Sequence, residues 1–301
     1  MFEELFSVNG ISIDRLKNFV DVAEKGSIAR VADGDASRQS LISRQISELE
    51  VFFGTQLTRR KGKGLELTEA GQELTRQTRL QFQGLADFKA SCSGQPVEYQ
   101  IAAGNSVIEW LVAPDMAGLA ETVPKGTFTL LDWRTGDIIR GLLNHIVDFG
   151  IVRKTALVRP LKFKPIGSLS YGLFVPTGNK AMAKTPFEEM PLAISIGGEF
   201  RSMFEEAAAR AGKRPTIVYR CTSFTQAAQL VRHGVAAAVL PLSATAALAG
   251  LSTIQPLPWL KEIVRDLGVA WHQRLLDVRP HAGEVLLELQ RTLRSRIERN
   301  E

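Results

Sequence analysis

Residues 38–53 read RQSLISRQISELEVFF, a stretch with two chemically different faces. Its apolar residues recur at intervals of four, three and four: Ile42, Ile46, Leu49 and Phe53. This spacing places them on one side of a helix. The opposite face carries short hydroxyls and side chains able to bond base edges or phosphates: Gln39, Ser40, Ser43, Arg44 and Ser47. The stretch therefore predicts a helix that buries one face in a core and presents the other to a polar partner.

The preceding residues predict two further helices and hence a helix-turn-helix. Ser12 or Asp14 can cap a first helix that Gly26 would end. Ser27 can cap a short second helix, and Ser37 can cap the third. Three short helices around one apolar centre form the geometry that lays the last helix in the major groove of DNA.

A cationic loop follows and predicts a wing. Two glycines, Gly62 and Gly64, loosen a cluster of basic side chains: Arg59, Arg60, Lys61 and Lys63. Residues 65–67 are strand-like, so the loop is presented beside the helix, where it suits contact with phosphates or the minor groove. Residues 38–63 hold six basic and two acidic side chains, whereas residues 1–90 hold 13 of each. A local patch, rather than the net charge of +5, therefore carries the electrostatic argument.

These motifs resemble the N-terminal signature of the LysR-type transcriptional regulators. The matching positions run without a gap over about 55 residues: Leu16, Phe19, 23–27 (AEKGS), Ala32, Gln39, 42–46 (ISRQI), Leu49, Glu50, Gly54, Leu57, Arg60 and 67–71 (LTEAG). Asp35, Ser37, Ser40 and Thr58 depart from the usual pattern. The resemblance implies a sequence-specific regulator that binds double-stranded DNA through a winged helix-turn-helix. The candidate DNA contacts are Ser27, Arg38, Gln39, Ser40, Ser43, Arg44, Arg59, Arg60, Lys61 and Lys63.

The composition fits a multidomain protein of a reducing compartment. A chain of 301 residues with 45% hydrophobic content can form two or three cores. Residues 1–10 contain Glu3 and Glu4 and no long apolar run, so we expect neither a signal peptide nor a membrane anchor. Cys92 and Cys221 are too few and too far apart for a disulfide framework. We expect a cytoplasmic protein.

Residues 68–89 predict one long helix capped by Thr68. Its seam recurs at steps of three and four: Ala70, Leu74, Gln77, Gln81, Leu85 and Phe88. Residues 91–96 (SCSGQP) would break it. The family resemblance implies that this helix pairs two subunits of a homodimer or homotetramer. We therefore expect a DNA-binding domain at 1–67, a linker at 68–90 and an effector-binding domain at 91–301.

Short strand-like runs alternate with helix-length segments beyond Pro96: 97–102, 127–132, 146–152, 173–175, 192–196, 216–220, 236–240 and 263–271. This alternation predicts an α/β fold with mainly parallel sheets. The length exceeds one comfortable sheet, and the pattern is similar to the two-lobed, periplasmic-binding-protein-like effector domain of the family. The lobes would comprise about 97–167 with 262–301, and about 168–261.

Ligands of open α/β sheets bind beyond the carboxyl ends of the strands, near helix starts. This rule selects candidate effector-binding residues in four loops: Asn105, Ser106, Arg134, Thr135, Arg201, Ser202, Thr222 and Ser223. The serines could equally be ordinary helix caps, and the two arginines surface residues. If Arg134 or Arg201 points into the cleft, an anionic effector such as a carboxylate is expected.

Besides a ligand-responsive regulator, an enzyme and a redox sensor are the alternative functions for this sequence. The sequence offers no support for an enzyme. It contains neither a phosphate-binding loop nor a nucleophile elbow. Its four histidines have no metal-ligand spacing: His145, His233, His272 and His281. We expect no metal and no cofactor. A redox sensor could use Cys221, because a nearby helix start would lower the pKa of its thiol.

Overall fold

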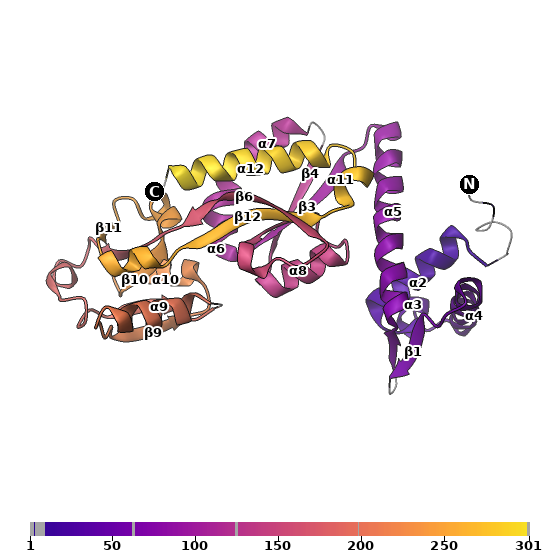
Figure 1. Ribbon diagram of the computed structural model, residues 1–301, viewed down its shortest axis with the longest axis horizontal. Coiled ribbons are helices and arrows are strands. Elements are labelled where there is room, and N and C mark those ends of the chain that lie inside the picture. The colour runs from indigo at the N-terminus through magenta and orange to yellow at the C-terminus, as the bar shows by residue number, and fades with distance from the viewer. Residues whose placement is uncertain (1–2, 4–9, 62–63, 124–125, 198, 300–301) are drawn as a thin grey trace. The chain divides into compact units, whose positions relative to one another are not determined.

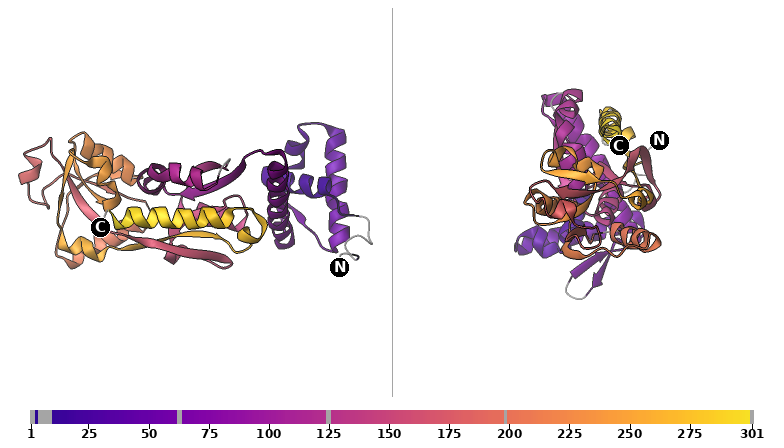
Figure 2. Two further views of the ribbon diagram at one scale, coloured as in Figure 1. Left: turned by 90° about the horizontal axis from the view of Figure 1, so that it is seen from above. Right: turned by 90° about the vertical axis from the view of Figure 1, so that its left-hand side faces the viewer.

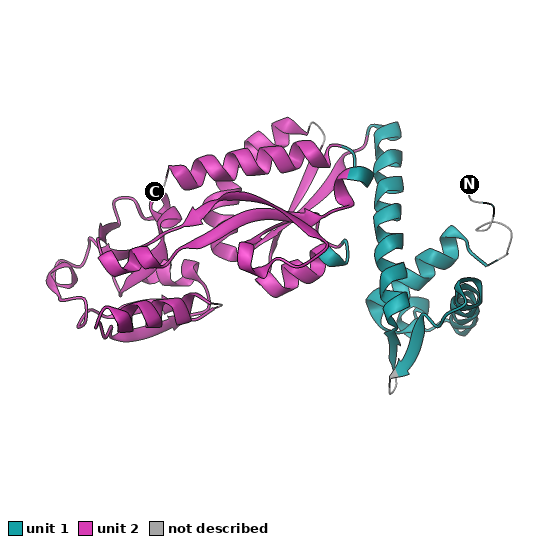
Figure 3. Ribbon diagram, in the orientation of Figure 1, with its two compact units in different colours: residues 1–94, 143–145, 277–280 teal, residues 95–142, 146–276, 281–301 magenta. Residues whose placement is uncertain are grey.

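The computed structural model describes residues 3, 10–61, 64–123, 126–197 and 199–299. Two compact units make up the chain (Figure 3). The first comprises residues 1–94, 143–145 and 277–280, and the second comprises 95–142, 146–276 and 281–301. The boundaries at 67/68 and 90/91 stay a prediction. Within the described residues, no helix has the length and apolar character needed to cross a bilayer.

The first unit is a three-helix cluster with a two-stranded wing and one long helix (Figure 1). Its elements are α2 (Ile13–Lys25), α3 (Ile28–Ala32), α4 (Ala36–Phe53), β1 (Thr58–Lys61), β2 (Gly64–Leu67) and α5 (Glu69–Ser93). The side chains of its buried core come from all three helices and from the start of the wing: Phe19, Val22, Val31, Ala32, Ile42, Ile46, Leu49 and Leu57. Phe53, predicted to share this face, is instead 37% exposed and lies edge-on to Phe52.

Helix caps explain where these helices begin. Ser12 caps α2 by accepting from the Arg15 amide, as one of the two predicted alternatives. The prediction that Ser37 caps the third helix is wrong. The Asp35 carboxylate accepts from the amides of Ser37 and Arg38 at 2.8 and 3.1 Å, so α4 begins at Ala36, two residues earlier than expected. An acid at this position satisfies two amides that have no partner within the helix.

The long helix α5 begins at its predicted cap, Thr68, whose side chain accepts from the Gly71 amide at 3.1 Å. It continues past Lys89 to Ser93 and ends within the predicted break, at Gly94, which adopts a left-handed conformation with φ of 64°. Gly71 allows α5 to pack directly on the backbone, since a Cβ there would lie 2.0 Å from the Leu57 carbonyl oxygen.

The remaining segments of the first unit contact the later turns of α5. Arg279 donates to both carboxylate oxygens of Asp87, at 2.7 and 3.1 Å, and both side chains are buried. Arg79 donates to the carbonyl of Asn144 at 3.3 Å and pairs with Glu24. Polar contacts therefore hold segments 143–145 and 277–280 on this helix.

The second unit contains two five-stranded sheets within the described residues, each belonging to one lobe. The first has the order β4-β3-β5-β12-β6: β3 (Val97–Ala103), β4 (Gly126–Asp132), β5 (Phe149–Arg153), β6 (Leu161–Leu169) and β12 (Arg265–His272). The second has the order β11-β7-β10-β8-β9: β7 (Tyr171–Pro176), β8 (Leu192–Ser195), β9 (Ile217–Cys221), β10 (Ala237–Pro241) and β11 (Ser252–Gln255).

Helices cover the sheets, as in a doubly wound α/β fold. On the first sheet, α7 (Met116–Thr122) and α12 (Ala282–Glu298) lie on one face and α8 (Thr135–Leu143) on the other (Figures 1 and 2). The loops beyond the second sheet lead into α9 (Phe200–Arg210) and α10 (Phe224–Arg232). The chain passes from the first sheet to the second between β6 and β7 and returns between β11 and β12.

The prediction of mainly parallel sheets is wrong, because both sheets are mixed. β3 is parallel to β4 and β5, whereas β12 is antiparallel to β5 and β6. In the second sheet, β8 is parallel to β9 and β10, and β7 is antiparallel to β10 and β11. β6 and β11 were not predicted. β12 and β7 therefore run opposite to the parallel strands beside them, β5 and β10.

Candidate nucleic-acid interface and effector site

Helix α4 keeps one face in the core and the other in solvent. Ile42 and Leu49 are fully buried, whereas Arg38, Ser43 and Arg44 are exposed. This separation matches the two faces expected from the sequence. The polar face of α4 is therefore accessible to solvent.

Two side-chain contacts fix how α4 lies on α2. Asn18 donates to the Gln45 amide oxygen at 2.7 Å, and Arg15 pairs with Glu48 at 2.7 Å. Glu48 also lies 3.4 Å from Arg44. The Arg44 side chain remains 72% exposed, and such a pair contributes little in water, so Arg44 can exchange it for a base or phosphate.

The wing is anchored at its base by Glu50, from α4. One oxygen of its carboxylate accepts from the amides of Leu57 and Thr58, at 2.9 and 3.0 Å, and from the Thr58 hydroxyl at 3.1 Å. Thr58, one of the four departures from the family pattern, therefore has a structural role. Arg59 pairs with Glu66 across the two strands at 3.0 Å.

The other candidate DNA contacts lie around these elements. Arg38 and Arg60 are exposed, and neither has an ion-pair partner among the described residues. Ser27 is half-buried ahead of α3. Gln39 and Ser40 lie in the first turns of α4. Gln39 is half-buried, whereas Ser40 is exposed and its hydroxyl donates to the Ala36 carbonyl at 3.1 Å. Lys61 is the last residue of β1, and Lys63 lies outside the described residues.

In the second unit, two of the four predicted effector loops meet. Asn105, at the start of the short helix α6 (Asn105–Val107), accepts a hydrogen bond from the hydroxyl of Thr225 in α10. The Ser223 hydroxyl lies 2.8 Å from that of Thr225 and caps α10 by accepting from Gln226. The loop beyond β3 in one lobe is thus joined to the loop beyond β9 in the other.

Three other candidates take no part in this contact between the lobes. Arg201 pairs with Glu205 at 2.7 Å, and both side chains are 47% exposed. Thr222 donates its amide and its hydroxyl to Gln226, each at 2.9 Å. Arg134 is exposed on the loop before α8.

The remaining three candidates are Ser106, Thr135 and Ser202. Ser106 and Thr135 are half-buried, and Ser202 is exposed. Neither Ser106 nor Ser202 caps a helix, because the cap positions of α6 and α9 are occupied by Gly104 and Glu199.

Two arginines that the sequence analysis did not select lie at the seam between the lobes. Arg153 ends β5, and its 13%-exposed side chain pairs with Glu199, which precedes α9 of the other lobe. Arg265 begins β12 and donates to the Tyr171 hydroxyl at 3.2 Å. The Nε atoms of both arginines are buried and have no hydrogen-bond partner within the described part of the chain.

Burial controls the protonation of this cluster. Burial, and next the charge of Arg265, lower the pKa of the Arg153 guanidinium, although arginine remains charged in proteins. Burial raises the pKa of Tyr171, so the phenol stays neutral. Among the described residues, Glu199 forms an ion pair with Arg153, and Arg265 has no ion pair with a carboxylate. The seam therefore holds more positive than negative charge.

Strand direction brings these residues together and explains why they were missed. Arg153 follows the rule that selected the other loops, since it lies at the carboxyl end of a strand parallel to β3. Arg265 lies at the amino end of β12, and the antiparallel register pairs Leu267 with Arg153. The amino end of β12 therefore shares an edge with the carboxyl end of β5. A sequence reading that assumes parallel strands places Arg265 at the opposite edge.

An aromatic cluster lines the second lobe at the same seam. Tyr171, at the amino end of antiparallel β7, lies with its ring centroid 4.6 Å from Phe200 and 5.8 Å from Phe224. Phe200 and Phe224 are 4.8 Å apart in an edge-on arrangement. Each phenylalanine begins the helix beyond a parallel strand, which positions α9 and α10 against the seam.

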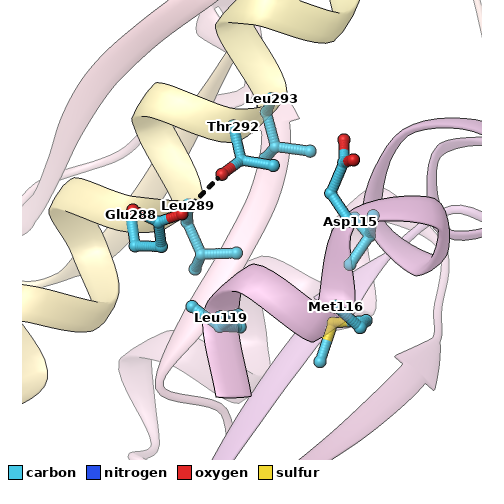
Figure 4. A pocket seen from close by; sticks show the side chains of 8 residues that line it. Asp115, Met116, Leu119, Glu288, Leu289, Thr292 and Leu293 are labelled. Atoms are coloured by element: carbon cyan, nitrogen blue, oxygen red, sulfur yellow. Dashed lines mark hydrogen bonds between the residues drawn. The ribbon is translucent and has the colours of Figure 1, made fainter. Parts of the chain in front are cut away.

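A separate pocket lies between α7 and α12 of the first lobe (Figure 4). Its volume of about 10 Å³ is the space that one water molecule needs. The groove beside it is lined by Asp115, which pairs with Arg296, by the pair Glu288 and Arg291, and by Arg299. Neither feature is suited to a small-molecule effector.

The cysteines and acidic groups offer little reactive chemistry. Cys221 is buried at the end of β9, and burial raises the pKa of its thiol. This is opposite to the expected lowering by a helix start. Cys92 is exposed on α5. Within the described residues, no group of three or more His, Cys, Asp or Glu side chains could hold a metal ion.

Comparisons with known proteins cover almost the whole chain. Residues 13–72 match the family described as bacterial regulatory helix-turn-helix protein, lysR family, and residues 95–289 match the LysR substrate binding domain. A probable hydrogen peroxide-inducible genes activator of Mycobacterium avium is 26% identical over 244 residues, which span 77% of this chain and 78% of that protein.

Solved structures show the same fold. Full-length LysG from Corynebacterium glutamicum, with its effector Arg bound, superposes with a TM-score of 0.65 at 17% identity and covers 96% of this chain and 99% of its own. Full-length CbnR in complex with its target DNA has a TM-score of 0.53 at 21% identity and covers 94% and 100%.

Proposed function

The chain belongs to the LysR family of bacterial transcriptional regulators, and we propose that it reads its operator through α4 and responds to an effector held at the seam between its two lobes. The relatives are regulators rather than enzymes. The observation that carries the proposal is the exposed polar face of α4 beside an anchored basic wing. A role on chromosomal DNA places the protein in the cytoplasm.

Base reading is assigned to α4. Gln39→Ala and Arg44→Ala should each reduce the discrimination between operator and random DNA by about 1–3 kcal/mol, because a bidentate contact to a base edge contributes that amount. Fluorescence anisotropy with both duplexes measures it. Arg76→Ala, on an exposed ion pair of α5, is the matched control and should change neither affinity. Equal losses on the two duplexes would contradict base reading by these residues.

Phosphate contact is assigned to the wing. Arg60→Ala or Lys63→Ala should weaken binding to all sequences alike and make the logarithmic salt slope about one unit shallower. Titrations at several salt concentrations measure the slope. An unchanged slope in both variants would remove the wing from the interface.

Association is assigned to α5. Leu85 and Phe88 are 54% and 68% exposed on this helix, although they belong to its predicted apolar seam. Two subunits joined there would present two recognition helices to two half-sites. A Leu85→Arg, Phe88→Arg double variant should sediment as a monomer. A Val51→Arg variant, which changes an exposed side chain of α4, should remain associated. Full association of the double variant would assign the main interface elsewhere.

Effector binding is assigned to the seam between the lobes. Asn105, Thr225 and Ser223 supply polar groups from two lobes, which fits a ligand that changes how the lobes close. An effector alters operator affinity only by the difference in its own affinity for the two states, typically about 1–3 kcal/mol. Operator DNA must therefore change effector affinity by the same factor.

Redox sensing is less well supported than ligand sensing. A relative is named a probable hydrogen peroxide-inducible activator. A sensor cysteine requires an accessible thiolate, whereas Cys221 is buried and its pKa is raised. If the protein senses a ligand rather than an oxidant, its operator affinity should be the same in peroxide and in reductant.

A further inference from the structure

We propose that the effector carries a carboxylate or a comparable anionic group, which binds Arg153 and Arg265 and replaces the Glu199 carboxylate that occupies Arg153 in this structure. This inference rests on the proposed function, because it names the chemistry of the effector at the same seam. It differs from the sequence prediction, which assigned anion binding to Arg134 and Arg201.

The first argument is the unbalanced charge. Arg153 and Arg265 bring two guanidinium groups into a partly buried seam, and among the described residues Glu199 pairs with Arg153 alone. The partner of Arg265 is instead the neutral hydroxyl of Tyr171. Burying a charge without a counter-ion is costly, so the seam favours a second anion.

The second argument is the unused hydrogen-bonding capacity. The Nε atoms of both arginines are buried without a partner in the described part of the chain. A guanidinium presents Nε and Nη donors in a planar fork that matches the two oxygens of a carboxylate. An anion at this place would satisfy donors that the protein itself leaves unsatisfied.

The third argument is that Glu199 can leave at little cost. Its side chain is 59% exposed, whereas that of Arg153 is 13% exposed, so the acid returns to water more easily than the arginine. Glu199 occupies the cap position of α9 but its side chain does not cap the helix. The free amides of the first turn of α9 therefore add further donors for an anion next to Arg153.

The exchange would give the effector a route to regulation. The Arg153–Glu199 ion pair joins one lobe to the other, as does the Asn105–Thr225 hydrogen bond. When an effector anion binds Arg153, the direct ion pair with Glu199 is broken and the ligand forms the connection between the lobes at this place. The Asn105–Thr225 hydrogen bond can remain. Lobe closure then depends on the ligand.

Anion-induced stabilisation of the full chain tests the exchange. Tryptophan fluorescence reports melting of the second unit, which contains all four tryptophans. Inorganic phosphate, succinate and neutral succinamide are added at constant ionic strength. Glu199→Gln should respond to an anion at concentrations about tenfold lower than the wild type, because the internal competitor is gone. Succinamide should have no effect, and the stronger of the two anions separates phosphoryl from carboxylate ligands.

Matched variants keep the test specific. Glu205→Gln releases Arg201 from an exposed pair on the same helix and should behave as the wild type. Adding Arg153→Gln or Arg265→Gln to the Glu199→Gln variant should abolish the gain. Equal responses of Glu199→Gln and Glu205→Gln, or stabilisation by succinamide, would overturn the inference. A chain that shows the anion response but binds no specific DNA would instead contradict the proposed function.

Discussion

The ion pair between Asp87 and Arg279 should account for a large part of the stability of the first unit. The Arg279 and Asp87 side chains are 2% and 6% exposed and share two hydrogen bonds of 2.7 and 3.1 Å. Arg279→Met keeps most of the aliphatic stem but leaves the carboxylate buried without its counter-ion. Such a loss costs about 3–5 kcal/mol, against about 5–15 kcal/mol for a whole domain.

Two comparisons isolate this effect. Arg76→Met removes a pair with Glu73 whose side chains are 30% and 53% exposed, and should cost less than about 1 kcal/mol. An Asp87→Leu, Arg279→Met double variant should recover much of the loss, because an apolar pair leaves no charge buried.

Urea unfolding followed by two signals measures the result. Far-ultraviolet ellipticity reports the helices of both units, whereas tryptophan fluorescence reports only the second. Arg279→Met should lower the midpoint of the ellipticity change that precedes the fluorescence change. A loss no larger than that of Arg76→Met, or a shift confined to fluorescence, would refute the reasoning.

Three further predictions concern other parts of the chain. Gly71→Ala should cost about 1–3 kcal/mol and weaken DNA binding, because its Cβ would lie 2.0 Å from the Leu57 carbonyl oxygen; an unchanged urea midpoint would contradict this. A hydrogen bond from Arg296 lowers the pKa of Asp115, so the pair stabilises the fold above the unfolded-state pKa and loses this contribution as pH falls below about 4. In the Arg296→Gln variant, the free energy of unfolding should therefore fall less steeply as the pH is lowered below about 4. A fall as steep as that of the wild type would count against the pair. Cys221→Ser should leave operator affinity unchanged in peroxide and in reductant, since the wild-type thiol is buried and protonated; an oxidant response lost in the variant would reverse the assignment.

The sequence was sufficient for most of the buried face of α4, because this face depends on a periodicity within one helix. The spacing of Ile42, Ile46 and Leu49 predicts the buried face of α4, and these three residues are buried. The cap of α4 was misassigned because Ser37 and Asp35 are both good caps, and only the backbone decides which side chain faces the free amides. Such a choice between neighbours is not encoded in periodicity.

The seam between the lobes could be predicted only in part, because it depends on strand direction. Asn105 follows the carboxyl end of β3, so a rule based on parallel strands finds it. Arg265 and Tyr171 lie at the amino ends of antiparallel strands, and their positions depend on pairings between residues far apart in the chain. Hydrophobic patterns do not distinguish parallel from antiparallel neighbours when a strand is buried on both faces.

In-vitro selection from a library of random DNA duplexes tests the central claim most directly. The protein should enrich one sequence with two related half-sites, their centres separated by about 34–36 Å or a multiple of that length. Gln39→Ala should bind the enriched duplex with reduced preference over random DNA. Failure of the wild type to enrich any sequence, under salt conditions in which it binds DNA, would contradict the account of this chain as an operator-reading regulator.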